Sequence, residues 1–161
     1  MQSVKSVRRV ISVIVQNEAQ VLARVSGLFA GRGYNIDSLT VAPIPNSNMS
    51  HMTIVTQGSA RVIEQIIKQL HKLIPVYKVI EHDSMVEKEM VLIKFSIKKD
   101  TNIANIQALF EAYNGSIVNA SESIIIAMAA DESHRITHCI EAASLYDPIE
   151  IVRSGVVAME R

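Results

Sequence analysis

The same pattern of apolar residues occurs twice along this chain. In the first copy they follow helical spacing over residues 22–29 and continue at Ile36, and the second copy repeats these positions 81 residues later, as from Ile36 to Ile117. The matched helical positions are Leu22, Val25, Leu28 and Phe29 in the first copy and Ile103, Ile106, Leu109 and Phe110 in the second. Because the repeat lies in packing positions rather than in reactive groups, it favours two copies of a small binding module over one catalytic domain.

The first copy predicts the element order β-α-β-β-α-β. β-branched residues alternate over residues 9–16, as in a central strand. Helical periodicity then runs from Val21 to Gly33, a residue suited to the left-handed turn that ends a helix. A strand over 34–42, a turn-rich loop over 43–48, a strand over 49–57, an amphipathic helix over 62–73 and a strand over 76–80 complete the unit. This order is the ferredoxin-like arrangement.

The second copy repeats the order after a polar stretch at residues 81–89, where we expect the domain boundary. A strand over 90–97, a helix capped by Asp100 or Thr101 and ending near Tyr113, strands over 116–121 and 123–130, a helix over 132–144 and a strand over 149–152 follow. We therefore predict an α+β protein with two tandem ferredoxin-like βαββαβ domains, residues 1–82 and 83–161. Exposed sheet edges pair readily with another chain, so we expect a homodimer.

The composition of the chain excludes some classes of partner. Sixteen basic and sixteen acidic residues cancel, which argues against nucleic acid, because a nucleic-acid-binding face normally carries a basic excess. No apolar run approaches the roughly 20 residues that span a bilayer, and the basic start lacks a signal-peptide cleavage pattern, so we expect no membrane contact. The single cysteine, Cys139, forms no intrachain disulfide and lies among apolar positions. We expect it to be buried, in a protein of the cytoplasm.

Catalytic and metal sites have weak support. Gly27, Gly31 and Gly33 close a helix, whereas a dinucleotide-binding fingerprint opens one. His134 and His138 have the spacing of two metal ligands on one helix face, but no third ligand lies close by, which favours a solvated face and no metal. His51, His71 and His82 have no evident triad partners in the sequence.

The first strand-to-helix loop is the one candidate site with a mechanism. Residues 16–20 lead into the helix near Val21, and free N–H groups at a helix start attract a carboxylate. Asn17 in this loop and Asn35 before the second strand each carry a donor and an acceptor. They are expected at opposite ends of the sheet, so one ligand reaches both only where two subunits meet. The alternative is that Asn17 is a turn or cap residue and that Asn35 belongs to the turn at Gly33.

Several segments closely resemble the small regulatory subunit of acetolactate synthase (acetohydroxyacid synthase). They are Asn17–Glu18, Leu22–Pro43, Met52–Ile54, Gln65–Leu73 and Arg153–Val157, and the match in which they lie extends over nearly the whole length. The resemblance implies an N-terminal ACT domain, an amino-acid-sensing module, followed by a second ferredoxin-like domain. It also implies a subunit without an active site, which binds and activates a catalytic large subunit and in many cases relays inhibition by valine. Thiamine diphosphate, magnesium and FAD then belong to the large subunit, and this chain has no cofactor of its own.

The resemblance also implies where the effector binds. Family members hold the amino acid between two ACT domains; Asn17 and Asn35 match side chains used there, and Gln20, Val21 and Leu22 match the loop that cradles the ligand, with Ile36 next to Asn35. Where the family usually has glycine, this chain has Gln20, which adds a Cβ and a long polar side chain. We therefore expect activation to persist and valine sensitivity to be weakened or lost.

Three other functions fit less well. The RNA-recognition fold shares this element order but needs aromatic platforms on its central strands, and aromatic residues are only 4% of this chain. An enzyme needs an acid–base or nucleophile constellation, which the sequence lacks. A stand-alone ACT regulator of another enzyme is the remaining alternative to the acetolactate synthase subunit.

Overall fold

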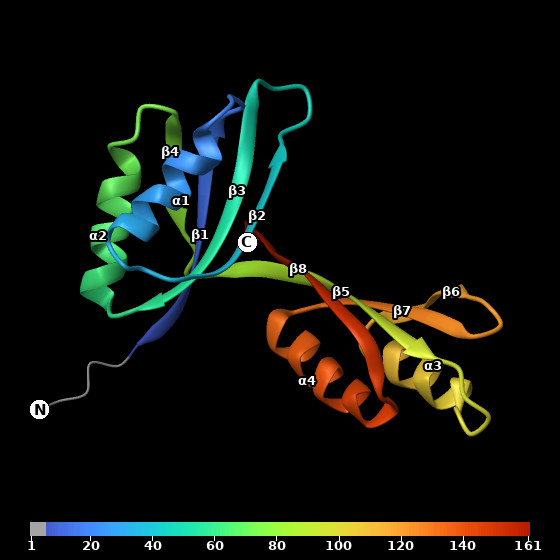
Figure 1. The fold of residues 1–161 in the computed structure, drawn as a ribbon. Helices are drawn as coiled ribbons and strands as arrows, with labels where there is room; N and C mark the ends of the chain where they lie inside the picture. Colours follow the sequence, from blue (N-terminus) through green and yellow to red (C-terminus); the bar gives the residue numbers. More distant parts are fainter. Residues whose placement is uncertain (1–5) are drawn as a thin grey trace, which may run out of the picture. The chain divides into compact units, whose positions relative to one another are not determined.

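The computed structural model describes residues 6–161, which fold into two compact units with the element order β-α-β-β-α-β (Figure 1). One unit holds the described residues up to Val86 together with Ala158–Arg161, and the other holds Glu87–Val157. The expected boundary after residue 82 lies just before this division, and the last four residues, expected in the second domain, cluster with the first unit. The predicted fold class, α+β with two tandem ferredoxin-like units, is confirmed.

The first unit is a four-stranded antiparallel sheet with two helices on one face (Figure 1). Its strand order is β2-β3-β1-β4, so β2 and β4 are the edges. The two central strands pair along their whole length, from Val7 opposite Gly58 to Gln16 opposite Met49. The elements are β1 (Val7–Gln16), α1 (Val21–Gly31), β2 (Ile36–Pro43), β3 (Met49–Gly58), α2 (Ala60–His71) and β4 (Val76–Glu81).

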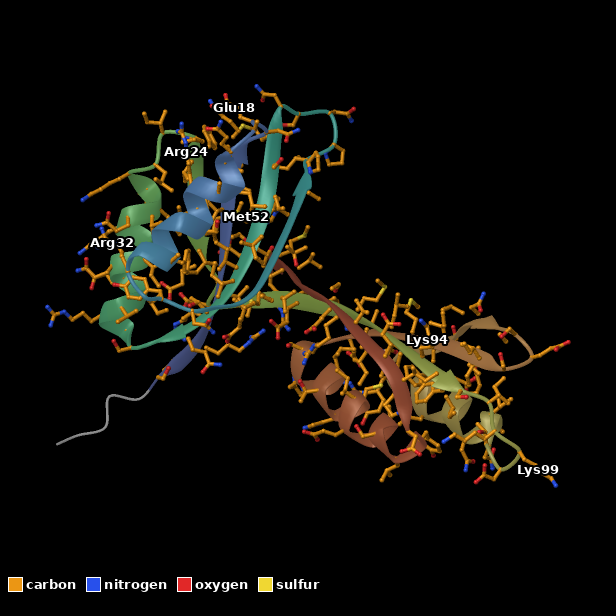
Figure 2. All side chains as sticks on the ribbon, viewed as in Figure 1. Glu18, Arg24, Arg32, Met52, Lys94 and Lys99 are labelled. Carbon is orange, nitrogen blue, oxygen red and sulfur yellow. The ribbon has the colours of Figure 1, made fainter. Side chains whose placement is uncertain are left out.

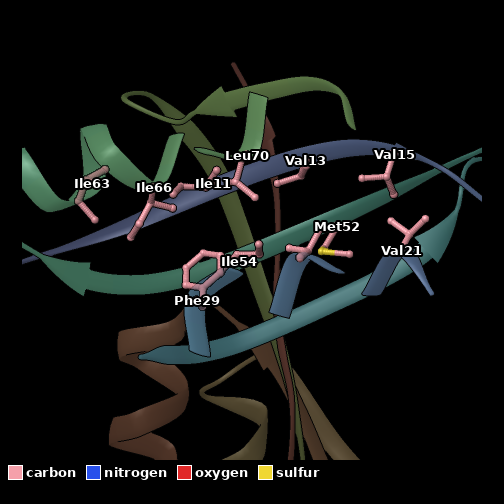
Figure 3. Close-up of a cluster of buried hydrophobic side chains, with 11 residues drawn as sticks. Ile11, Val13, Val15, Val21, Phe29, Met52, Ile54, Ile63, Ile66 and Leu70 are labelled. Carbon is pink, nitrogen blue, oxygen red and sulfur yellow. The ribbon is translucent and has the colours of Figure 1, made fainter. Parts of the chain in front are cut away.

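The core of this unit lies between the sheet and the two helices (Figure 3). Alternation along each strand puts every second residue on the helical side, and the helices contribute residues at helical spacing. Burying one large apolar side chain contributes roughly 1.5–3 kcal/mol, so this cluster accounts for much of the unit's stability. Its members are Ile11, Val13, Val15, Val21, Val25, Phe29, Met52, Ile54, Ile63, Ile66 and Leu70.

The second unit repeats this design with strand order β6-β7-β5-β8. The 3₁₀ turn Ser144–Tyr146 follows its last helix. Cys139 is fully buried in its core, as predicted, and burial raises the pKa of its thiol to about 11. The elements are β5 (Met85–Ser96), α3 (Ile103–Glu111), β6 (Gly115–Ala120), β7 (Ile124–Asp131), α4 (Ser133–Ala143) and β8 (Pro148–Glu160).

The sequence repeat extends to the backbone conformation. The turn after α1 has Gly33 at φ 67°, and the turn after α3 has Asn114 at φ 57° at the matching position. Near the start of each following strand the pairing register shifts by one residue, after Ile36 in β2 and after the matching Ile117 in β6. The two units therefore share a left-handed turn and a β-bulge at equivalent positions, in addition to their apolar pattern.

Two strands are longer than the sequence predicts. β5 begins at Met85, inside the polar stretch expected to be a linker, and β8 runs far beyond the predicted 149–152. Buried ion pairs explain the first difference, because Glu89 is 5% exposed and accepts two hydrogen bonds from Arg153 of β8. A hydropathy pattern does not predict a strand whose charged residues form ion pairs with another strand. The cap of α3 also differs: Asn102, not Asp100 or Thr101, accepts the Asn105 N–H.

Asp131 is the most heavily bonded carboxylate in the second unit. Its oxygens accept hydrogen bonds from Arg135 Nε at 2.5 Å, Lys88 Nζ at 3.2 Å, Asn114 Nδ2 at 3.1 Å and the Glu132 N–H at 2.8 Å. Burial by itself would raise the pKa of Asp131, but these donors outweigh it and lower the pKa to about 2. The carboxylate thus joins β5, β7, α4 and the turn before β6.

Replacing Asp131 with asparagine tests this junction. Because the folded pKa lies below the ordinary value, the charge stabilises the fold fully above about pH 5 and loses its effect as the pH falls from about 4 to 2. We expect Asp131→Asn to lower the free energy of unfolding at pH 7 by about 1–3 kcal/mol and to flatten the acid limb. Urea unfolding midpoints from pH 2 to pH 7 measure both effects.

The matched control is Asp147→Asn. The Asp147 side chain is 86% exposed and lies 3.7 Å from Lys98, so this change should leave the midpoint nearly unaltered. An Asp131→Asn protein that unfolds at the same urea concentration as the wild type at pH 7 would contradict the assignment.

Candidate effector site

The loop between β1 and α1 is anchored by backbone hydrogen bonds on both sides. Asn17 N–H donates to Asn48 O at 2.9 Å, and Gln16 N–H donates to Pro75 O at 2.9 Å. These bonds bring the β2–β3 and α2–β4 connections to the same end of the sheet, where Glu18 is labelled in Figure 2. The Asn17 side chain is exposed, so its amide is available to a ligand.

Gln20 enters α1 in an unusual conformation. It has φ 73° and ψ −8°, the left-handed region that glycine adopts readily and glutamine does not. No side chain caps this helix start, and the Gln20 side chain is exposed. The Val21 N–H lies 3.5 Å from Glu18 O, and the N–H groups between it and Arg24, which makes the first bond to Gln20 O, have no side-chain cap; uncapped N–H groups at a helix start are a geometry that binds a carboxylate. Glutamine therefore occupies a backbone conformation that glycine adopts at lower cost.

Of the next two residues of the expected site, Val21 lies in the core and Leu22 lies at the surface. Val21 is 5% exposed and packs in the core, whereas Leu22 is 48% exposed. Val21 therefore fixes the position of the helix start, and Leu22 presents an apolar surface beside it. An apolar side chain of an amino-acid effector has a surface to contact here.

Asn35 lies exposed before β2 and is oriented by its neighbours. Its Nδ2 donates to Asp37 Oδ1 at 3.0 Å, and its carbonyl oxygen accepts from Thr56 Oγ1 at 2.6 Å. Gln57 Nε2 donates to the other Asp37 oxygen at 2.9 Å. Ile36 packs partly against the core and holds the strand start in place.

Asp37 and Gln57 are the residues that the sequence analysis missed. Asp37 is the residue passed over by the register shift between Ile36 and Ser38, so its side chain reaches back to Asn35. An aspartate two residues after an asparagine is a known local hydrogen-bonding spacing and was the available signal. The sequence around Gln57 gave no such signal, because its partner, Asp37, lies on another strand.

One chain does not bring the two asparagines together. Asn17 adjoins the Met49 end of β3, and Asn35 adjoins Thr56 near its other end. At about 3.3 Å per residue, the two ends lie roughly 25 Å apart. A single amino acid cannot contact both within one protomer, as expected from the element order.

The histidines form no catalytic arrangement within the described residues. His134 and His138 stack edge to face with centroids 6.2 Å apart, and no cluster of three or more metal-ligating side chains occurs in residues 6–161. His51 and His82 share Ser12, whose Oγ lies 2.9 Å and 2.6 Å from their Nε2 atoms. Burial, and then the neighbouring His82, lowers the pKa of His51. Ser12 is fully buried, so no substrate reaches its hydroxyl.

β1 and β3 also lack the aromatic residues that an RNA-recognition sheet uses, since neither strand contains Phe, Tyr or Trp. In the described part of the chain, no helix is long and apolar enough to cross a membrane.

Comparisons with known proteins agree over both units. Residues 11–78 match the family model described as an AHAS small subunit-like ACT domain, and residues 88–161 match the one described as the small subunit of acetolactate synthase. The acetolactate synthase small subunit of Buchnera aphidicola is 41% identical over 94% of this chain and 96% of its own length. The isozyme 3 small subunit of Escherichia coli is 39% identical over 96% of each chain.

A solved structure supports the same relationship. The acetolactate synthase small subunit from Thermotoga maritima superimposes with a TM-score of 0.86 at 33% identity, covering 96% of this chain and 98% of that one.

Replacing Gln20 with glycine should relieve backbone strain. A left-handed conformation costs a residue with a Cβ about 1–2 kcal/mol, and glycine loses part of that gain to its more flexible unfolded state. We expect Gln20→Gly to raise the free energy of unfolding by about 1 kcal/mol, measured by urea unfolding.

Ala19→Gly is the control, because Ala19 is not in the left-handed region and gains nothing from glycine. It should be neutral or destabilising. Equal effects of the two substitutions would show that Gln20 is not strained.

Proposed function

This chain belongs to the family of acetolactate synthase small subunits, and we propose that it binds the catalytic large subunit and raises its activity. The observation that carries the proposal is the full-length match, which includes both units and covers 96% of the E. coli relative. Thiamine diphosphate, Mg²⁺ and FAD would be held by the large subunit, and the complex would work in the cytoplasm, in branched-chain amino acid biosynthesis.

The arrangement of β2 favours a homodimer through the ACT domains. β2 is an edge strand, and an edge strand presents unpaired N–H and C=O groups. Two antiparallel β2 strands related by a two-fold axis would place Asn35 of one protomer beside the Pro43 end of the other. That end adjoins Ser50 of β3 and lies near Asn48, which holds Asn17. Such a dimer would bring Asn35 of one protomer close to Asn17 of the other, which one chain alone does not do.

An amino acid such as valine would bind in this interface. Its carboxylate would meet the uncapped start of α1, with Asn17 from one protomer and Asn35 from the other holding the polar groups. Val21 and Leu22 border the site, and Ile36 supports Asn35 from the core. The Cβ and side chain of Gln20 lie at the helix start and would crowd the carboxylate.

Reconstitution with the purified large subunit tests the main proposal. We expect the large subunit alone to turn over pyruvate slowly and its activity to rise severalfold on addition of this chain. Saturation of that rise gives the affinity, and light scattering of the mixture gives the stoichiometry. Equal activity with and without the chain, together with no co-elution, would contradict the proposal and favour a regulator of another enzyme.

Valine titration of the reconstituted enzyme tests the role of Gln20. Allosteric coupling is typically about 1–3 kcal/mol, and one steric intrusion can remove most of it. We expect valine to inhibit the wild type weakly or not at all. We expect it to inhibit Gln20→Gly at a concentration about tenfold lower than the wild type requires, or lower still.

Asn17→Ala in the Gln20→Gly background is the control, because it removes a ligand contact without restoring the glutamine side chain. It should abolish the gained sensitivity while activation persists. Ordinary inhibition of the wild type at low valine concentration would refute the steric account.

A further inference from the structure

A groove runs between α1 and α2 on the side of these helices that faces away from the sheet. It has a volume of about 560 Å³, and no strand residue lines it. Leu28 and Leu73 give it an apolar part, and both also pack against the core. Its lining residues are Arg24, Gly27, Leu28, Gly31, Arg32, Gln69, Lys72 and Leu73.

Positive charge accumulates in this groove without compensation. Arg24 and Arg32 (labelled in Figure 2) and Lys72 line it, and no acidic residue does. None of the three forms an ion pair with a described residue, although many other cations of this chain do, such as Arg9 with Glu81 and Lys68 with Glu64. Because the whole chain has a formal net charge of zero, the groove is a local departure from the charge balance.

Two helical glycines keep the groove open. A Cβ built on Gly27 or Gly31 would meet nothing within 4 Å, so internal packing does not require glycine at either position. Other glycines of the chain differ: a Cβ on Gly58 would lie 2.9 Å from Val62 Cγ1, and one on Gly115 would collide with the Met128 carbonyl oxygen. Gly27 lies in the interior of α1, where glycine weakens a helix, and its remaining benefit there is the close approach of another backbone to α1.

We propose that this groove binds an acidic, helix-sized segment of a protein partner. The identification of that partner as the catalytic large subunit rests on the proposed function. An amphipathic helix that lies in a groove between two helices is a common recognition mode, and acidic side chains on it would pair with the three free cations. A second copy of the chain fits poorly, because two copies of this face would oppose positive charges to positive charges.

Charge reversal tests the electrostatic part. Arg24→Glu and Lys72→Glu should each weaken binding of the full chain to the purified large subunit about tenfold or more, measured by calorimetry. Wild-type affinity should fall as NaCl rises from about 0.05 to 0.3 M. Lys99→Glu, in the loop before α3 of the other unit, makes the same charge change outside the groove and should alter affinity less than about twofold.

Filling the groove tests the glycines independently of charge. Gly27→Leu adds a side chain where the chain itself leaves space, so thermal unfolding should stay the same or rise, while binding weakens about fivefold or more. Ala30→Leu adds bulk to an exposed position of α1 that does not line the groove, and should leave binding unaltered. Opposite effects on stability and binding exclude misfolding as the cause.

The outcomes separate this proposal from the one on which it rests. If the Arg24→Glu, Lys72→Glu and Gly27→Leu variants all bind the large subunit with the wild-type affinity, the groove is not the binding site, and the proposed function is unaffected. A charge variant that changes the mass of the isolated chain in light scattering also overturns it, because the groove is then a contact between copies. A wild type that does not bind the large subunit overturns the proposed function itself, and the partner assignment with it.

Discussion

The packing of Val15 and Val21 in one core is the constraint on which the first unit's site depends. Val15 is near the end of β1 and Val21 starts α1, and both are almost fully buried. The short loop between them has little freedom, because both of its ends are held by burial worth roughly 1.5–3 kcal/mol per large apolar side chain. That stabilisation exceeds the cost of a left-handed glutamine, about 1–2 kcal/mol, so the fold retains Gln20 in a glycine conformation.

The same one-sided packing explains why the proposed effector site would need two protomers. Helices cover one face of the sheet, and α1 runs back along the sheet from the Asn17 end before the short connection to β2 begins. Asn17 and Asn35 are therefore separated by a strand's length, however the loops are arranged locally. Only a neighbour whose β2 runs in the opposite direction returns an Asn35 to the Asn17 end. The element order thus makes effector binding and dimerisation a single event in the proposed function.

The sequence predicted the fold class and the elements because their signal is local. Apolar periodicity and the residues at Gly33 and Asn114 depend on near neighbours, and both turn residues have positive φ. Contacts between distant residues were not predictable in this way. β5 and β8 were underestimated because Glu89 and Arg153 neutralise each other across strands. The proximity of Asp37 to Asn35 became apparent only from the bulge in β2, and that of Lys72 to Arg24 and Arg32 only from the arrangement of the helix pair.

The two copies of the fold differ in how the first helix of each begins. In the second unit, Asn102 caps α3 by accepting the Asn105 N–H, and Thr101 Oγ1 accepts the Lys98 N–H in the loop before it. In the first unit, the matching helix begins at Val21 after Gln20 with no side-chain cap, and among its first N–H groups only that of Val21 has a loop acceptor, Glu18 O at 3.5 Å. An uncapped helix start lowers stability and is retained where an anion supplies the missing acceptor. Because α4 of the second unit also starts without a side-chain cap, this contrast between the units is confined to the first helix of each, and their topology is the same.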